Sequence, residues 1–467
     1  MLLVTVASAT LLGACASSGP KTSARGAGRG STTTATTAPA PTTAAADRSG
    51  ADWVTYFHDA SRTAFTSDAP AAPKQVHRRW RSPRLDGDVY AEPLLAGRRV
   101  IVATENDSVY SLDVSSGAIA WRTHLADPVP ASSLPCGNVD PVGITGTPVV
   151  DRSTSRIYVV GMVRPAAHKL FELDLATGHL VASKVVDVPG ADPLVHNQRS
   201  ALTLSRGMVD IPFGGRFGDC GDYHGRVTSV RVAASGLGAM TTYTLPTQSE
   251  GGFWAPPGAA TAADGSLYLA SGNSSSSTTY DYGNSVVRLS AGLKLLDSFA
   301  PANWKALNAT DGDIGSSGPV LLPAGRIFQI GKSGVGYLLD AAHLGGIGGA
   351  LYSAPVCGSG VWGAVGHNRE TLFVPCSDGV ERVTVAGDRF AVGWKAAVST
   401  PGPPIVTPNA IWCVETGSGN LVALNPSTGA SLISIAIGTV PSRFTVPAAG
   451  ARLVLVAADR SVSAFGD

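Results

Sequence analysis

Short runs of alternating apolar and polar residues recur along most of the chain, and several of them end in a turn of the same spacing. In these runs the last strand position is followed by Asp or Asn, and Gly follows four residues later. The Asp or Asn side chain can accept hydrogen bonds from the turn backbone, and glycine tolerates the positive φ that such a turn needs. Another apolar run precedes each segment. The clearest copies are residues 109–117, 170–178 and 421–429, and a degenerate copy ends at Asp340.

Units of about 40 residues with several short strands each are typical of the blades of a β-propeller. The expected blades lie near residues 87–127, 140–188, 199–246, 252–300, 312–354, 357–397 and 401–437. The last unit, 442–467, lacks an outermost strand, and the segment 76–81 around Trp80 is suited to supply it. We therefore expect an all-β, eight-bladed propeller closed by an N-terminal strand. The alternative is seven blades, with the first segment forming a separate cap.

Composition agrees with this architecture and excludes several classes of protein. The chain has a net charge of +1 and 15% charged residues, whereas a nucleic-acid-binding surface is strongly basic. No stretch after the N-terminal run is long and apolar enough for a membrane-spanning helix, which needs about 20 residues. The sequence contains no P-loop, no G-x-S-x-G elbow and no C-x-x-C-H haem motif.

The N-terminal residues predict export and anchoring. An apolar run from Leu2 to Leu12 leads into small residues and then Cys15. The run is too short to span a bilayer, and it is similar to the signal of bacterial lipoproteins, which are cleaved before a cysteine that then carries lipid. We expect residues 1–14 to be a signal peptide and Cys15 to be lipidated, which anchors the protein to a membrane on its extracytoplasmic side. No Lys or Arg precedes the run, and the alternative is an ordinary secretory signal with a chance cysteine.

Residues 15–50 are expected to form a flexible tether. After Cys15 they are almost all Ala, Thr, Ser, Gly and Pro, which cannot bury enough apolar surface to offset their chain entropy. Random-coil scaling gives such a segment a reach of roughly 30 Å. The folded propeller is then expected to comprise residues 51–467.

The chain has six cysteines, and five remain once Cys15 is set aside. Disulfides are permitted outside the cytoplasm, and the absence of C-x-x-C argues against a structural zinc site. We expect the pairs Cys136–Cys220, in long loops of neighbouring blades, and Cys357–Cys376. Cys413 lies within an apolar strand and is expected to be a buried free thiol.

Two segments carry a resemblance to a known family. Residues 106–117, followed by Trp121, resemble the repeat of the quinoprotein dehydrogenase-like propellers, and residues 53–63 resemble the lead-in of the same group. The resemblance spans about residues 52–467. Some members of the group bind pyrroloquinoline quinone (PQQ) with calcium and oxidise alcohols. Others, such as the outer-membrane assembly lipoprotein, keep the repeat without the cofactor and act as scaffolds.

The resemblance also implies a candidate site. In the dehydrogenases a Trp lies under the quinone, an Asn and a carboxylate bind calcium, an Asp is the general base, and a Lys or Arg contacts the quinone. The matching positions are Trp254 for the floor, Asn273 with Asp219 or Asp222 for calcium, Asp313 for the base and Lys332 for the quinone contact. Asp313 matches the base position better than Asp311. Hard oxygen ligands suit calcium, and a carboxylate can accept the proton of an alcohol.

The same residues also have structural interpretations. Asn and Asp cap turns, and Trp packs between blades, in propellers of any function. The adjacent cysteines that many alcohol-oxidising members carry beside the cofactor are missing here. The sequence therefore favours a lipid-anchored extracytoplasmic propeller acting as a binding or scaffold module for an unidentified protein or small molecule. The alternative is a PQQ- and calcium-dependent alcohol dehydrogenase that passes electrons to an external acceptor.

Overall fold

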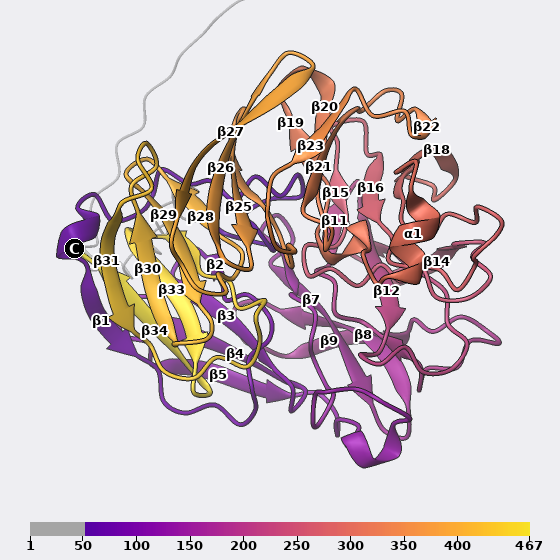
Figure 1. The fold of residues 1–467 in the computed structure, drawn as a ribbon. Helices are drawn as coiled ribbons and strands as arrows, with labels where there is room; N and C mark the ends of the chain where they lie inside the picture. Colours follow the sequence, from indigo (N-terminus) through magenta and orange to yellow (C-terminus); the bar gives the residue numbers. More distant parts are fainter. Residues whose placement is uncertain (1–51) are drawn as a thin grey trace, which may run out of the picture. The chain divides into compact units, whose positions relative to one another are not determined.

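Eight sheets follow one another along the chain and form an eight-bladed β-propeller (Figure 1). The computed structural model describes residues 52–467. The expected signal peptide, the Cys15 lipidation site and the tether up to residue 50 lie outside the described residues. None of the helices in residues 52–467 is long and apolar enough to cross a membrane.

The blades are numbered here in chain order of their innermost strands. Blade 1 contains β2 (Leu94–Ala96), β3 (Arg99–Thr104), β4 (Ser108–Asp113) and β5 (Ile119–His124). Blade 2 contains β6 (Val149–Asp151), β7 (Arg156–Val163), β8 (Ala167–Asp174) and β9 (Leu180–Val185). Blade 3 contains β10 (His196–Asn197), β11 (Thr203–Ser205), β12 (Met208–Gly215), β13 (Arg226–Ala233) and β14 (Gly236–Thr244). Blade 4 contains β15 (Ala260–Thr261), β16 (Leu267–Ala270), β17 (Val286–Leu289) and β18 (Leu295–Ala300), with β22 (Gly346–Ile347) at its outer edge.

The second half of the ring repeats the pattern. Blade 5 contains β19 (Val320–Leu322), β20 (Arg326–Gln329), β21 (Val335–Asp340) and β23 (Tyr352–Pro355). Blade 6 contains β24 (Gly366–Asn368), β25 (Thr371–Cys376), β26 (Gly379–Ala386) and β27 (Arg389–Ala396). Blade 7 contains β28 (Ile405–Thr407), β29 (Ala410–Glu415), β30 (Asn420–Leu424) and β31 (Ser431–Ala436). Blade 8 contains β32 (Ala448–Gly450), β33 (Leu453–Ala458), β34 (Ser461–Gly466) and β1 (His77–Arg81). The helical segments are α1 (Trp304–Ala309), η1 (Pro73–Gln75), η2 (Ala131–Ser133), η3 (Ile314–Ser316) and η4 (Pro323–Gly325).

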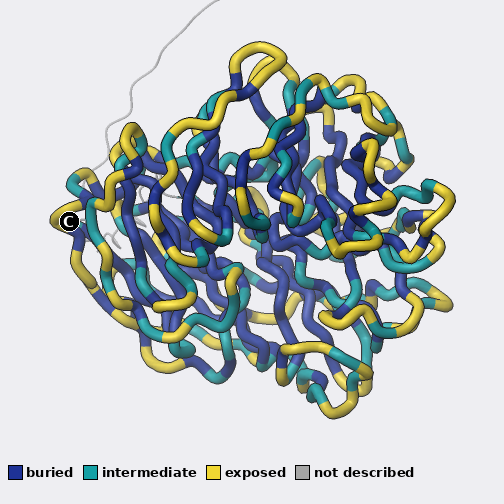
Figure 2. Tube along the Cα trace, in the orientation of Figure 1, coloured by how far each residue is buried: buried dark blue, intermediate teal, exposed yellow. Residues whose placement is uncertain are grey.

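Burial explains why inner and outer strands have different patterns of apolar and polar residues. The inner strands β3 and β4 are buried along almost their whole length, because neighbouring blades cover both faces of the sheet. The outermost strand β5 alternates between exposed and half-buried positions. Buried positions accordingly run along the strands, whereas exposed ones gather at turns and at the outer rim (Figure 2). Near-continuous apolar runs therefore mark inner strands, and polar alternation marks outer strands.

The N-terminal strand closes the ring, as the sequence predicts. Strand β1 pairs antiparallel with β34, with Trp80 opposite Ala464 and Arg81 opposite Ser463. Figure 1 shows the indigo β1 beside the yellow C-terminal strands. Eight blades are confirmed, and the alternative of seven blades with a separate cap is wrong. The segment 76–81 pairs with blade 8 because the third strand of that blade would otherwise expose an unpaired edge.

The turn glycines serve two purposes. Gly117 has φ of +70° and its N–H donates to the Asp113 carbonyl at 2.8 Å, so the expected turn is present. A Cβ on Gly117 would also lie 2.4 Å from the ring of Trp80, whose indole N–H donates to the Val114 carbonyl. The same contact between neighbouring blades recurs in three pairs: Gly117 with Trp80, Gly178 with Trp121, and Gly429 with Trp394. Each glycine therefore permits both its turn and the seat of a tryptophan from the preceding blade.

The segment from residue 52 to residue 66 fills the centre of the ring, and we call it the plug. Its backbone hydrogen-bonds with Leu95, Val150, Thr261 and Val406, on or beside the innermost strands of blades 1, 2, 4 and 7. Trp53, Tyr56 and Phe57 are at most 1% exposed. Arg62 is buried as well and donates to Leu202 and Thr203 at blade 3. The lead-in segment thus joins five blades from inside.

Both expected disulfides are present. Cys136 bonds Cys220, between the loop that leads into blade 2 and a hairpin of blade 3, and Cys357 bonds Cys376. Cys413 is free and fully buried. Burial, with a smaller contribution from Glu415, raises the pKa of its thiol to about 12.

A thiol count tests this assignment. In a Cys15→Ala chain, no thiol should react with Ellman's reagent in the native state, because Cys413 is buried and protonated at neutral pH. Exactly one should react after unfolding without reductant. Reaction in the native state, or a count of three after unfolding, would contradict the pairing, and peptide mapping without reduction identifies the bonded partners.

Candidate functional site

The propeller topology brings the predicted site residues to one face of the ring. Trp254 and Asp313 lie in the loops that lead into β15 and β19, the innermost strands of blades 4 and 5. Asn273 and Lys332 follow the second strands, β16 and β20, of the same blades. Loops that enter innermost strands and hairpins that follow second strands lie on the same side, because successive strands run in opposite directions. We call this side the upper face.

Four of the predicted residues form one cluster with Asp311. Lys332 Nζ lies 2.5 Å from Asp311 Oδ1 and 2.8 Å from Asp313 Oδ2. The amide nitrogen of Asn273 donates to Asp311 Oδ1 at 2.8 Å and approaches Asp313 Oδ2 at 3.4 Å. Lys332 Nζ also lies 5.4 Å from the centroid of the Trp254 ring. We call Trp254, Asn273, Asp311, Asp313 and Lys332 the Lys332 cluster.

The backbone around the cluster is tightly fitted. A Cβ on Gly214 would lie 2.7 Å from Cβ of Trp254, and a Cβ on Gly272 would lie 2.9 Å from its indole nitrogen. The side chain of Asn284 donates to Asn273 Oδ1 at 3.0 Å and accepts from the N–H of Ile314 at 3.1 Å. These contacts fix the indole and orient the Asn273 amide toward the carboxylates.

The two carboxyl groups of the cluster differ sharply in environment. The Asp311 side chain is 74% exposed, whereas that of Asp313 is 3% exposed. Burial raises the pKa of Asp313 to about 6, although Lys332 opposes the shift. Burial also opposes the charge of Lys332, but Asp313 and Asp311 outweigh it and raise the pKa of the ammonium group. Asp313 Oδ1 is buried and has no hydrogen-bond partner among the described residues, so one oxygen of this carboxyl is left for another group.

The two alternative carboxylates of blade 3 are placed differently. Asp219 accepts a hydrogen bond from Tyr223 at 2.6 Å, and its charge adds to the effect of burial and Asp311 in raising the pKa of Asp313. The side chain of Asp222 is 79% exposed, and its neighbour is His224 at 3.7 Å. The structure therefore brings Asp219, rather than Asp222, toward the cluster.

Other blades around the channel contribute residues that no sequence motif marks. Phe444, which precedes the innermost strand of blade 8, meets Trp254 edge to face with a centroid distance of 6.2 Å. The guanidinium of Arg199, from blade 3, lies 4.3 Å from the centroid of Phe444 and donates to Ser442 at 3.1 Å. It also lies 6.0 Å from the ring of Tyr90. These residues meet across the channel only because the ring closes, so their positions along the sequence give no signal.

The cluster suits an organic ring better than a metal ion. Trp254 is half-buried and offers an aromatic surface. Lys332 lies beside its ring, and the charge of its ammonium group is paired with two carboxylates. Asn273, Asp311 and Asp313 supply the hard oxygens that calcium prefers. Within residues 52–467, however, no three His, Cys, Asp or Glu side chains converge to hold a metal ion. The ammonium of Lys332 lies between the two carboxylates where a cation would be expected, so the residues as arranged do not fit calcium.

Comparisons with known proteins agree with the fold. The family model described as outer membrane protein assembly factor BamB matches residues 73–211. No curated protein matches the chain. A quinohemoprotein alcohol dehydrogenase of Pseudomonas putida HK5 superposes with a TM-score of 0.65 at 13% identity, covering 90% of this chain and 81% of that one. A europium-containing methanol dehydrogenase gives a TM-score of 0.65 at 14% identity, covering 88% and 90%.

BamB of Moraxella catarrhalis is also similar in structure. It gives a TM-score of 0.55 at 12% identity, covering 84% of this chain and all of that one. At these identities the similarity concerns the fold alone, and the fold is shared by dehydrogenases and an assembly factor. The chain therefore has the β-propeller fold of these proteins, and its residues 73–211 match the family model of the assembly factor.

Proposed function

We propose that this protein is a lipid-anchored, extracytoplasmic propeller that binds a planar organic ligand at the Lys332 cluster. The observation that carries the proposal is the convergence of Trp254, Lys332 and Asp313, three residues from different loops, at one point of the upper face. Such a site combines an aromatic surface with a few fixed polar groups, which is the usual composition of a small-molecule site.

Each part of the cluster has a defined role in binding. The half-buried face of Trp254 offers stacking, and the ammonium of Lys332, 5.4 Å from the ring centroid, offers N–H groups that donate hydrogen bonds. Asp313 carries one buried oxygen without a partner, and its pKa of about 6 lets it accept or donate a hydrogen bond near neutral pH. The cluster therefore favours a flat ligand with a hydrogen-bonding edge.

A PQQ-dependent alcohol dehydrogenase is the second candidate. The observation that favours it is the pKa of Asp313, about 6, because a general base works best when its pKa lies near the operating pH. The resemblance assigns PQQ the role of accepting the electrons of the alcohol. Asp313 would then take the hydroxyl proton, and Lys332 would contact the quinone. Calcium would need the carboxylates to turn away from Lys332.

One titration distinguishes these functions, with PQQ as the probe. Saturable binding without Ca²⁺, weakened at least tenfold in Lys332→Met and accompanied by no dye reduction, is the expected result. A ligand at 100 times its Kd should raise the free energy of unfolding by about 2.7 kcal/mol, which thermal shift detects. Lys395→Met, which removes an exposed lysine of blade 6, is the matched control.

Two other outcomes would replace or overturn the proposed function. Binding that requires Ca²⁺, with dye-linked alcohol oxidation that falls about 10²- to 10⁴-fold in Asp313→Asn while binding survives, would replace the proposal by the dehydrogenase. In that case Asn273→Ala should weaken binding itself. No saturable binding with or without Ca²⁺ would overturn both functions.

Anchoring is tested separately. Cys15→Ala should release the protein from the membrane fraction into the soluble fraction, because acyl chains are the expected membrane contact and each buried CH₂ contributes about 0.8 kcal/mol. A high-salt wash serves as the control for peripheral attachment. If the variant stays with membranes after the wash, lipidation of Cys15 is not the anchor.

A further inference from the structure

We propose that the seam between blades 8 and 1 is a second binding site, which takes a small organic molecule carrying a phosphate or carboxylate group. A cavity of about 550 Å³ opens there, a size typical of small-molecule sites. Its polar lining includes Arg81, Arg84, Asp88, Tyr90, Thr439 and Arg460. These residues meet because β1 closes the ring, which brings residues 81–90 and residues 439–460 together as the two walls of the cavity.

The charged groups of the cavity are fixed in place but not balanced. Arg460 Nε lies 2.8 Å from Asp88 Oδ1, and Arg81 lies 3.1 Å from Asp459. Asp459 is held in turn by the backbone N–H of Thr439 at 2.9 Å. Two aspartates therefore hold two arginines at defined positions, and a third arginine remains without a counter-charge.

That third arginine is Arg84. Its one polar contact is a weak one, 3.5 Å from the backbone carbonyl of Asp459, and it has no carboxylate partner among the described residues. Three arginines against two aspartates leave the cavity with an excess positive charge. A guanidinium presents a planar fork of N–H donors that matches the oxygens of a phosphate or carboxylate, so an anion is the group that completes this site.

The rest of the lining indicates an organic body attached to the anion. Val89, Val440 and Pro441 form apolar wall, and the half-buried Tyr90 adds a ring with a hydroxyl group. Tyr90 also faces Arg199, so the cavity adjoins the channel mouth. Alternating apolar and hydroxyl surface next to an arginine fork suits a sugar phosphate or a sugar acid better than free inorganic phosphate.

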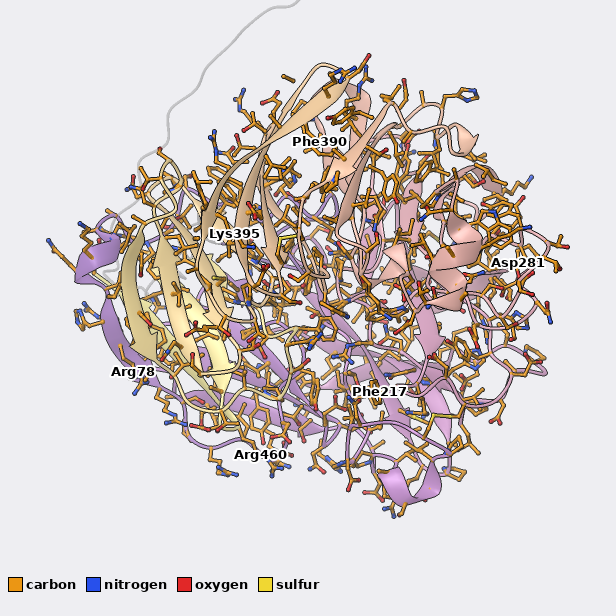
Figure 3. The ribbon with its side chains drawn as sticks, in the orientation of Figure 1. Arg78, Phe217, Asp281, Phe390, Lys395 and Arg460 are labelled. Atoms are coloured by element: carbon orange, nitrogen blue, oxygen red, sulfur yellow. A yellow bond between two sulfur atoms is a disulfide. The ribbon has the colours of Figure 1, made fainter. Side chains whose placement is uncertain are left out.

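The site is distinct from the Lys332 cluster. The cavity lies between blades 8 and 1, whereas the cluster belongs to blades 4 and 5 across the ring. Figure 3 marks Arg460 near the β33–β34 hairpin, at the rim of the seam. The inference therefore does not depend on what the cluster binds, and each site can fail without the other.

Calorimetric titration with glucose 6-phosphate and with glucuronate tests the site, with glucose and inorganic phosphate as reference probes. We expect saturable binding of at least one sugar anion, weakened by salt, and none of glucose. The binding should fall at least tenfold in Arg84→Glu, because the reversed charge repels the anion. Arg98→Glu is the matched control, since Arg98 is a 74% exposed arginine of blade 1 on the turn between β2 and β3, outside the cavity.

Every other outcome overturns the inference. Absence of saturable binding by both sugar anions removes the site. If Arg84→Glu and Arg98→Glu weaken binding equally, the binding reflects general surface charge and not a site in the cavity. Loss in Lys332→Met with retention in Arg84→Glu places the anion at the Lys332 cluster instead. Tighter binding of inorganic phosphate than of either sugar anion removes the organic part of the proposal.

Discussion

A chain that begins after Arg81 is expected to lose cooperative folding, whereas a chain lacking only residues 16–50 should unfold like the parent. The first deletion removes both β1 and the plug. Without β1, strand β34 becomes an unpaired edge, and the seat of Trp80 against Gly117 of blade 1 is lost. The ring then has neither its closing strand nor the contact that joins its two ends.

Removing the plug as well as β1 should lower the stability more than the loss of β1 pairing alone. Trp53, Tyr56 and Phe57 are fully buried, and truncating one large buried aromatic side chain costs about 3–5 kcal/mol. Three such losses reach the whole net stability of a typical domain, about 5–15 kcal/mol. The plug also hydrogen-bonds to several innermost strands, so its removal leaves buried backbone groups without partners.

Urea unfolding followed by circular dichroism measures the effect. A chain that begins at residue 67 keeps β1 but lacks the plug, and its stability should fall between those of the parent and of the chain that begins at residue 82. Equal midpoints for the chain that lacks residues 16–50 and the chain that begins at residue 82 would refute both ring closure and the plug. If the chain that begins at residue 67 has the same midpoint as the parent, ring closure by β1 stands and the plug does not stabilise the propeller.

The strands, the blade count and the disulfides could be predicted because the signals are local or repeated. An inner strand is apolar because two neighbouring blades cover it, and this holds in every blade, so the pattern recurs along the chain. The closing strand could be predicted because the last unit, residues 442–467, lacks an outermost strand. The Cys136–Cys220 disulfide followed from placing both cysteines on loops of adjacent blades.

The plug and the contacts across the channel could not be predicted in the same way. The lead-in around Trp53 has no periodicity, and its buried position follows from contacts with strands of five different blades. Phe444 and Arg199 lie 245 residues apart in sequence and meet by the closure of the ring. Asp219 and Asp222 stand three residues apart, and only the turn geometry of their hairpin directs the first toward the Lys332 cluster.

Replacing Lys332 with Ala should lower the free energy of unfolding by about 3–5 kcal/mol at pH 8, because it leaves the buried carboxylate of Asp313 without its partner. The loss should shrink as the pH falls toward 5. Burial raises the folded-state pKa of Asp313 to about 6, above its unfolded value. Its favourable contribution is therefore complete below the unfolded pKa and is lost as the pH rises through about 6.

Without Lys332 the folded-state pKa of Asp313 moves further up, so the penalty at pH 8 grows, whereas at pH 5 the carboxyl is protonated in both proteins. Lys395→Ala is the matched control. Its nearer partner Asp378 lies 2.6 Å away with both side chains at least a third exposed, and Glu381 lies farther, at 3.6 Å, so the expected loss is below about 1 kcal/mol. Urea unfolding at pH 5, 6.5 and 8 measures all three proteins. A loss in Lys332→Ala that is the same at pH 5 and pH 8 would mean that Asp313 is not the group that titrates, and the cluster would then owe its stability to packing around Trp254 rather than to the buried ion pair.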